Sequence, residues 1–329
     1  MEQEPRTLQE AAVYFSDPVR CREYIVKRRW PNGVSCPTCG SAKVTFSEKH
    51  NRWQCGSHHA KRQFTVKTST IFEDSPLSLD KWLVAMWLVA NCKNGVSSWE
   101  VHRALGITQK TAWFMLHRIR YAAHSDSGDK LSGECEVDES FIGGRARNMH
   151  LDVRKRRITG RGPTNKTAVF GVLERASGDG AHSKVRTKVI VNRKKKTLQA
   201  GVRANVQAGA ALYSDALLSY EGLESEYAHQ VVDHAVEYVR GKVHTNGLEN
   251  FWSLFKRGIN GTYVSVEPFH LFRYLDEQEF KFNNRGTREK PVTDADRFDL
   301  VVRQILGKRL TYQQLTGNVG EQCQTSAAW

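Results

Sequence analysis

The spacing of hydrophobic positions changes along the chain and divides it into a helical first part and a strand-rich second part. Through residues 7–30, and again from Trp82 to Val89, apolar residues recur at helical spacing, which predicts helices. Beyond the polar segment 125–129 the apolar runs are shorter and are bounded by glycines and acidic residues, which is typical of strands. We therefore expect a domain boundary in this segment.

The second part is predicted to be an α/β domain with a mixed five-stranded sheet. Three strands come in succession, and two more follow a crossover helix at about residues 197–208. The predicted strands are 133–144, 167–173, 185–191, 210–215 and 229–234. One further helix is expected at Phe298–Leu306, before a polar tail that is predicted to be disordered from Gln322 onward.

A helix that begins near residue 245 combines a buried face with a chemical face. Its apolar stripe consists of Leu248, Phe251, Phe255 and Ile259. Glu249 and Lys256 lie two turns apart, so a carboxylate and an ammonium project in one direction. The plainer interpretation is that Glu249 closes a capping box with Asn246 and that Lys256 is a solvated surface charge.

The net charge favours a polyanion as partner. The formal charge is +14 at pH 7, and much of it lies in two blocks. Residues 145–166 contain eight Lys or Arg and only Asp152 as an acid, and residues 184–203 contain eight Lys or Arg and no acid. Such fields suit nucleic acid. A membrane surface is a poorer partner, because neither block has a matching apolar face.

The remaining composition predicts a cytoplasmic protein. The acidic start of the chain is followed by no apolar segment, so no secretory signal is expected. The longest apolar run, Trp82 to Ala90, is less than half of the ~20 residues that a membrane span needs. Seven cysteines, an odd number with three of them clustered, indicate a metal site rather than a disulfide framework.

Three cysteines and a histidine have the spacing of a zinc ribbon. Cys36 and Cys39 form one pair, and Cys55 begins a second pair in which His58 is the favoured fourth ligand and His59 competes with it. Two tight turns that each supply two ligands make a tetrahedral site for one structural Zn²⁺. The alternative is three reduced cysteines in a small core, which the fifteen-residue gap between the two pairs disfavours.

A helix-turn-helix is predicted between the ribbon and the linker. Ser97 caps a helix at 99–105, Gly106–Thr108 forms the turn, and a basic second helix runs from about 109 to 123. The residues expected at its DNA-facing end are Gln109, Lys110, Trp113 and His117. Many such helical pairs bind nothing, but the zinc ribbon and the positive charge favour DNA binding.

Three acidic residues are predicted to meet in the second domain. Asp138 lies on the first strand, Asp215 ends the fourth, and Glu249 lies on the helix that follows the fifth, which is the order of a ribonuclease-H-like fold. Convergent carboxylates can hold two Mg²⁺ or Mn²⁺ ions, ~3.5–4 Å apart, for phosphoryl transfer. Asp215 could instead cap a following helix. Strand alternation is expected to turn Glu139 away from Asp138.

Several long motifs resemble those of insertion-sequence DDE transposases of the ISXO-like group, which carry an N-terminal zinc ribbon. The motifs are Val137–Gly144, Tyr213–Asp215, His244–Arg257, Gly261–Tyr263, Arg273–Leu275 and Phe280–Arg285, together with the ribbon cysteines and Thr68–Phe72. The resemblance covers most of residues 20–285. Two positions depart from it: Val264 stands where a histidine is expected, and His58 where relatives usually have cysteine.

The resemblance implies a transposase of a bacterial insertion sequence. Asp138, Asp215 and Glu249 would be its catalytic triad, and Lys256 an accessory lysine that contacts DNA. Such an enzyme recognises terminal inverted repeats, nicks the element's ends and joins the freed 3′-hydroxyl to target DNA. A homodimer or larger assembly is expected, because two ends must be held together. Further predicted DNA contacts are Arg156, Arg157, Lys194, Lys195, Lys196 and Arg257.

The resulting domain plan has five parts and leaves two other functions open. The parts are an N-terminal helical segment (1–30), the zinc ribbon (31–74), the helix-turn-helix region (75–124), the ribonuclease-H-like domain (131–290) and a C-terminal helix with its tail (291–329). The alternatives are a catalytically silent DNA-binding regulator and a nuclease without strand transfer. Loss of a triad acid would favour the regulator, and all three acids are present.

Overall fold

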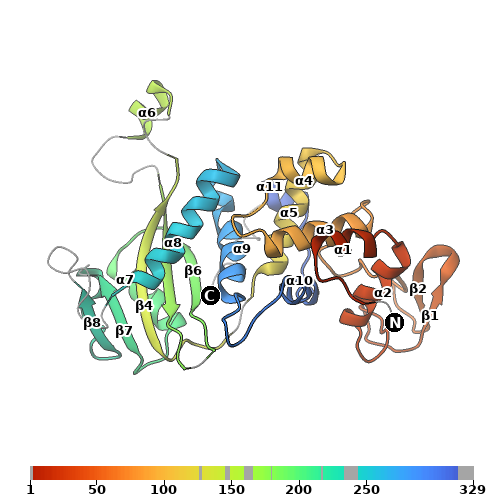
Figure 1. Cartoon of the computed structure of the whole chain (residues 1–329), viewed down its shortest axis with the longest axis horizontal. Helices are drawn as coiled ribbons and strands as arrows, with labels where there is room; N and C mark the ends of the chain where they lie inside the picture. Colours follow the sequence, from red (N-terminus) through yellow and green to blue (C-terminus); the bar gives the residue numbers. More distant parts are fainter. Residues whose placement is uncertain are drawn as a thin grey trace. The chain divides into compact units, whose positions relative to one another are not determined.

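The computed structural model describes residues 3–125, 128–144, 149–158, 166–178, 180–215, 218–232 and 244–317, with the backbone alone at Val153, Arg157 and Val232. The described residues form two compact units. The first consists of residues 3–125 and 293–317, and the second lies within 128–292. Figure 1 labels most of their helices and strands. The tail predicted to be disordered from Gln322 lies outside the described residues.

The first unit takes helices from both ends of the chain. These are α1 (Leu8–Tyr14), α2 (Pro18–Arg29), α3 (Leu79–Asn91), α4 (Ser98–Leu105), α5 (Gln109–Ala123), α10 (Asp294–Arg303) and α11 (Tyr312–Thr316). α10 packs against α2, α3 and α5. Its Phe298 ring centroid lies 5.0 Å from that of Trp87 and 5.7 Å from that of Phe15. The C-terminal helix, predicted as part of a separate segment, therefore completes the core of the first unit.

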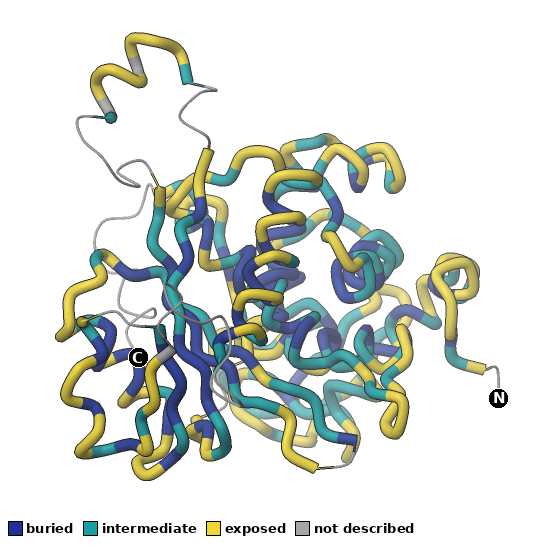
Figure 2. The backbone as a smooth tube through the Cα atoms, turned by 60° about the vertical axis from the view of Figure 1, so that its left-hand side comes forward, coloured by how far each residue is buried: buried dark blue, intermediate teal, exposed yellow. Residues whose placement is uncertain are grey.

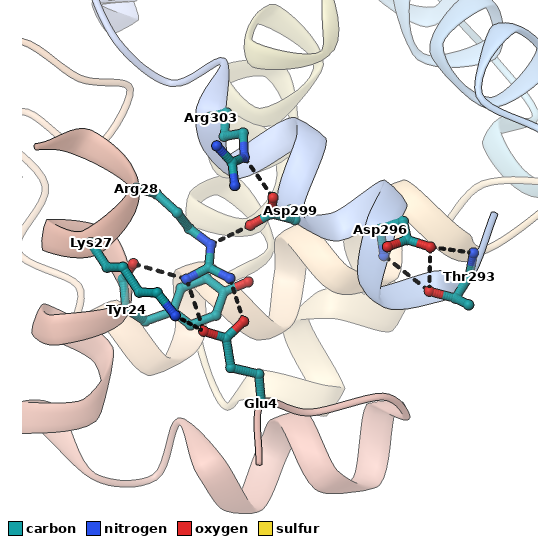
Figure 3. Close-up of polar contacts among 8 residues, drawn as sticks. All are labelled: Glu4, Tyr24, Lys27, Arg28, Thr293, Asp296, Asp299 and Arg303. Carbon is teal, nitrogen blue, oxygen red and sulfur yellow. Dashed lines mark hydrogen bonds and ion pairs between the residues drawn. The ribbon is translucent and has the colours of Figure 1, made fainter. Parts of the chain in front are cut away.

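Two helix boundaries differ from the predicted ones for local reasons. The helical region 7–30 is interrupted, because Asp17 caps α2 and Pro18 occupies its first turn. α10 begins at Asp294 rather than at Phe298, because Thr293 and Asp296 form a capping box (Figure 3).

An ionic cluster joins α2 to α10 and to the start of the chain (Figure 3). The Arg28 guanidinium donates to Glu4 Oε2 at 2.6 Å and also to Asp299, and it lies 3.3 Å from the centroid of the Tyr24 ring. Burial opposes ionisation of Glu4, but the hydrogen bonds and charges of Arg28 and Lys27 outweigh it and lower the pKa of Glu4. The cluster thus stabilises a guanidinium that is almost entirely buried.

A small antiparallel sheet precedes α3. Its order is β1 (Val44–Ser47), β2 (Arg52–Cys55) and β3 (Gln63–Phe64). Trp53 stacks on Phe64 with 5.8 Å between ring centroids and meets Phe46 at 4.7 Å. These rings supply the small sheet with its own apolar contacts, and β2 ends at Cys55.

The second unit is built on a mixed five-stranded sheet of order β6-β5-β4-β7-β8. The strands are β4 (Glu134–Ile142), β5 (Thr167–Glu174), β6 (Lys184–Ile190), β7 (Ala211–Asp215) and β8 (Ala228–Val232). β4, β5 and β6 pair antiparallel, whereas β7 pairs parallel with both β4 and β8. This confirms the predicted mixed five-stranded sheet and places β4 at its centre.

Helices cover both faces of this sheet. On one face, α7 (Lys195–Asn205) packs Leu198 and Val202 against Val137 and Phe170. On the other face, α8 (Asn246–Gly258) and α9 (Leu271–Asn283) pack against the alternate strand residues, among them Val169. Figure 2 shows much of the sheet buried; most residues of β4, β5 and β7 are buried, whereas α6 (Leu151–Arg157), between β4 and β5 in the chain, is exposed. Since side chains alternate along a strand, Glu134, Glu136 and Asp138 lie on the α8 face.

Candidate active site and metal centre

Asp138 lies in the middle of the central strand, where both of its oxygens accept hydrogen bonds. Oδ1 accepts from the Glu139 amide at 2.8 Å, and Oδ2 accepts from the indole Nε1 of Trp252 on α8 at 3.0 Å. An amide and an indole fix the carboxylate without neutralising it. The carboxylate is therefore held in one orientation on the α8 face of the sheet.

Asp215 lies beside Asp138 on the neighbouring strand. The parallel pairing of β4 with β7 sets Glu136 opposite Tyr213, and the same register continued by two residues sets Asp138 opposite Asp215. Burial, together with the charges of Asp215 and Glu249, raises the pKa of Asp138 to about 6, against the hydrogen bonds that Asp138 accepts. The predicted acids therefore lie within electrostatic reach of one another.

Glu249 comes to this site because α8 packs closely on the sheet. Leu248, Phe251, Trp252 and Phe255 are buried, and Glu249 remains exposed beside them. The close approach depends on Gly171, which pairs with Asp138 from β5: a Cβ there would lie 2.7 Å from Cζ2 of Trp252. Trp252 was missed in the sequence, although its position one turn after Glu249 and the glycine in an otherwise apolar strand are visible signals.

Lys256 follows one turn after Trp252 on α8. Partial burial lowers the pKa of Lys256, the charge of Asp138 opposes that shift, and Lys166 adds to it. The ammonium thus lies within electrostatic reach of the acid site.

Glu139, the neighbour of Asp138, is turned to the other face of the sheet, as alternation predicts. Its Oε1 accepts a hydrogen bond from the hydroxyl of Tyr220, which belongs to the core on the α7 side. Burial raises the pKa of Glu139 to about 7, with further contributions from the charges of Asp215 and Asp138. A second carboxylate with a weakened tendency to ionise therefore lies directly behind the site.

The chemistry of the donor set fits Mg²⁺ or Mn²⁺, which prefer oxygen ligands. Octahedral Mg²⁺ holds its ligand oxygens at about 2.1 Å, so two ligands of one ion are at most about 4.2 Å apart. Among the described residues, only a cysteine–histidine group brings three or more ligand atoms within 4.8 Å of one another. As these side chains stand, Asp138, Asp215 and Glu249 are therefore too far apart for all three to bind one ion.

The cysteine–histidine group consists of Cys36, Cys39, Cys55 and His59. Sγ of Cys39 lies 3.7 Å from Sγ of Cys55, and Sγ of Cys36 lies 3.4 Å from Nε2 of His59. A zinc tetrahedron requires about 3.8 Å between two sulfurs and about 3.6 Å between sulfur and nitrogen. Burial opposes ionisation of Cys36, but hydrogen bonds from the Cys39 and Thr38 amides lower its pKa to about 6. The group fits a structural zinc ion.

The fourth member of this group corrects the sequence prediction. His58 was favoured, but its side chain is exposed, and His59 is the histidine beside the cysteines. β2 ends at Cys55, the chain bends at residues 56–57, and the Gly56 amide donates to the Lys43 carbonyl at 2.7 Å. After this bend it is His59, four residues after Cys55, that lies beside the cysteines.

The predicted DNA-facing end of α5 is only partly exposed. His117 is 0% exposed and packs edge-on against Trp113, so its assignment as a DNA contact is wrong. The physical reason is that α5 packs against α3, α4 and α10 and is buried at most positions from Met115 onward. Gln109 donates to Ser98 Oγ at 2.9 Å, whereas Lys110 is exposed, with its Nζ 4.7 Å from the centroid of the Tyr312 ring.

The other predicted DNA contacts lie on the surface of the second unit. Exposed side chains are those of Arg156 on α6, Lys194, Lys195 and Lys196 at the start of α7, and Arg257 on α8. The Arg157 side chain, and residues 145–148 and 159–165 of the first basic block, lie outside the described residues. Within the described parts of the chain, no helix has the length and apolar character that crossing a membrane requires.

Comparison with known proteins gives one family match for the second unit and another for the segment with the cysteine–histidine group. Residues 130–283 match the ISXO2-like transposase domain, and residues 17–59 match a transposase zinc-ribbon domain. An uncharacterized protein in transposable element ISH50 of Halobacterium salinarum is 26% identical over 293 residues, which cover 85% of this chain and 95% of that protein. An uncharacterized transposase-like protein of Haemophilus influenzae is 32% identical over 102 residues, 31% of this chain and 82% of that protein. No solved structure matches the chain.

Proposed function

Because the chain belongs to the family of ISXO2-like transposases, we propose that it is a DDE transposase that cuts the ends of an insertion sequence and joins them to target DNA. The observation that supports this proposal is that two acids from other elements, Asp215 of β7 and Glu249 of α8, lie within electrostatic reach of Asp138 on β4.

The topology of the second unit supports a ribonuclease-H-like catalytic domain. Three antiparallel strands are followed by a helical crossover and two parallel strands, and helices cover both faces. The first of these strands is central and carries Asp138, so that the acids from β7 and α8 can converge on it. A function without catalysis gives no reason for three carboxylates to lie together against their mutual repulsion.

The proposed chemistry is direct in-line displacement at phosphorus, with no covalent enzyme intermediate. Mg²⁺ or Mn²⁺ ions held by Asp138, Asp215 and Glu249 would stabilise charge on the attacking and leaving oxygens. The protein's own part is to hold the ligands ready: Trp252 orients Asp138. Lys256 extends near the site, where an ammonium can contact a DNA phosphate.

The remaining features supply DNA recognition and assembly. One Zn²⁺ on Cys36, Cys39, Cys55 and His59 would hold the ribbon together, and the ribbon with α4 and α5 would recognise the terminal repeats. Lys194, Lys195 and Lys196 would contact the DNA backbone. The pathway needs two element ends in one complex, so we expect a homodimer or a larger assembly.

The test uses a labelled duplex that carries the element's end, taken from the DNA that flanks the gene. Purified protein is incubated with it in Mg²⁺ or Mn²⁺, and nicking and strand transfer are resolved on denaturing gels. Asp215→Asn and Glu249→Gln are expected to abolish both reactions while DNA binding persists. Glu267→Gln, an exposed acid outside the site, is the matched control and should act as wild type.

Each other outcome selects a different function. Binding without cleavage in either metal would replace the transposase with a DNA-binding regulator. Cleavage without joining would replace it with a nuclease.

A further inference from the structure

A fourth carboxylate lies on the α8 face of β4, two residues before Asp138. Glu136 is only 1% exposed. Carboxylates are almost never buried to this degree unless they are paired and hydrogen-bonded. The partners of Glu136 therefore indicate its role.

Glu136 binds the beginning of α8. Its Oε2 accepts a hydrogen bond from the Leu248 amide at 3.0 Å. Thr245, at the N-cap position, makes no side-chain hydrogen bond to the helix, so a carboxylate from the neighbouring strand takes the capping role. The fit is close, because a Cβ at Gly247 would lie 2.8 Å from the same oxygen.

Arg175, the residue after β5, completes this junction. Its Nε donates to Glu136 Oε1 at 2.8 Å, and its Nη2 donates to the His244 carbonyl at 2.6 Å. Its Nη1 lies 3.3 Å from Glu134 Oε2, and the guanidinium carbon lies 4.3 Å from the centroid of the Tyr213 ring. One guanidinium thus connects β4, β7 and the chain just before α8.

The junction controls two side chains of the site. Leu248, whose amide Glu136 holds, directly precedes Glu249, and Trp252 follows one turn later with its hydrogen bond to Asp138. A displacement at the start of α8 therefore displaces both side chains relative to Asp138.

We propose that Glu136 and Arg175 are a positioning pair that fixes α8 against the sheet and so sets the place of Glu249 at the metal site. Neither residue has to touch metal or DNA for this role. The expected effect on DNA cleavage rests on the function proposed above, whereas the effect on the helix does not.

The deciding variant is Glu136→Gln in the full-length protein. Its single carbonyl oxygen can serve the Leu248 amide or Arg175, but not both. Glu136→Ala leaves Arg175 without its most buried partner and can unfold the unit, so it is not relied on. Glu134→Gln is the matched control. It removes the other carboxylate that pairs with the Arg175 guanidinium, and among the described residues Glu134 makes no hydrogen bond to α8.

Two readouts besides cleavage report on positioning. Mn²⁺ affinity, followed by the electron paramagnetic resonance signal of the free ion, should fall about 10–100-fold in Glu136→Gln, as for other residues that orient metal ligands. Hydrogen exchange at the Leu248 amide should become faster in the same variant. Glu134→Gln, whose carboxylate is 42% exposed, should stay within about twofold of wild type in both.

The results separate the two proposals. Wild-type Mn²⁺ affinity and wild-type exchange in Glu136→Gln would overturn the positioning role, and so would equal losses in Glu134→Gln. If the wild-type protein cuts no DNA, the proposed function fails, and the exchange at Leu248 still decides whether Glu136 fixes α8.

Discussion

At the scale of the residue, the missing side chain of Gly171 decides how closely α8 can approach the sheet. The indole of Trp252 occupies the space that a Cβ would take, and from there it reaches Asp138. Interiors are packed densely enough that even one methyl group must displace a neighbour. Gly171 is thus part of the site without contributing a functional group to it.

Gly171→Ala is expected to displace Trp252, break its hydrogen bond to Asp138 and reduce DNA cleavage. Overpacking of this kind costs about 1–3 kcal/mol of unfolding free energy. Urea denaturation and the cleavage assay measure the two effects. Gly133→Ala is the control, because its Cβ would meet nothing nearer than 3.4 Å. Equal behaviour of the two variants would contradict the packing argument.

A second prediction at this scale concerns the ionisation of Asp138 in protein to which no Mg²⁺ or Mn²⁺ has been added. Its pKa is raised from 3.8 to about 6 on folding, so the ionised form is penalised in the native state. This loss of stability is absent below pH 3.8, grows as the pH rises to about 6, and reaches its full size above pH 6. Asp138→Asn should therefore raise the thermal unfolding temperature of the second unit near neutral pH and leave it unchanged in strong acid. A gain independent of pH would contradict this account.

At the scale of the element, the periodicity of hydrophobic residues predicted correctly which face of a strand or helix a side chain lies on, but it did not predict contacts with distant elements. Alternation along β4 was enough to place Asp138 and Glu139 on opposite faces, and the apolar stripe of α8 was enough to predict its buried side. Both patterns are local. The exposure of His117 was predicted wrongly because it depends on the packing of α3, α4 and α10 on α5, which the local pattern of α5 does not contain. The capping of α8 by Glu136, a residue of β4, could not be predicted from the sequence around α8 either.

The choice between two adjacent histidines is a prediction about the ribbon. His59→Ala should weaken zinc binding at least about tenfold, since even outer-shell changes cost that much, whereas His58→Ala should keep zinc. Competition with a chromogenic chelator gives the affinities, and metal analysis gives the stoichiometry. Loss of zinc from His58→Ala with retention in His59→Ala would restore the original choice.

At the scale of the whole molecule, the first unit is assembled from the two ends of the chain. Phe298 of α10 is 1% exposed within a ring cluster built from α1, α2 and α3. The ion pair of Arg28 and Asp299 also attaches this helix to α2. The C-terminal helix is thus a structural member of the N-terminal unit.

Phe298→Ala is expected to destabilise this unit by about 3–5 kcal/mol, the usual cost of removing a buried aromatic ring. Phe269→Ala, at a position that is 52% exposed, should change stability by less than about 0.5 kcal/mol. Guanidinium denaturation followed by tryptophan fluorescence compares the two. Similar small losses in both would show that α10 is dispensable for the core.

The return of α10 makes the first unit depend on the last part of the chain. During synthesis, residues 3–125 leave the ribosome first, and α10, which packs on α2, α3 and α5, follows only after the second unit has been made. A copy truncated before α10 by a frameshift or an early stop codon therefore lacks one wall of the first unit's core. If the first unit binds the element's ends as proposed above, such a truncated copy should compete poorly for them with an intact one.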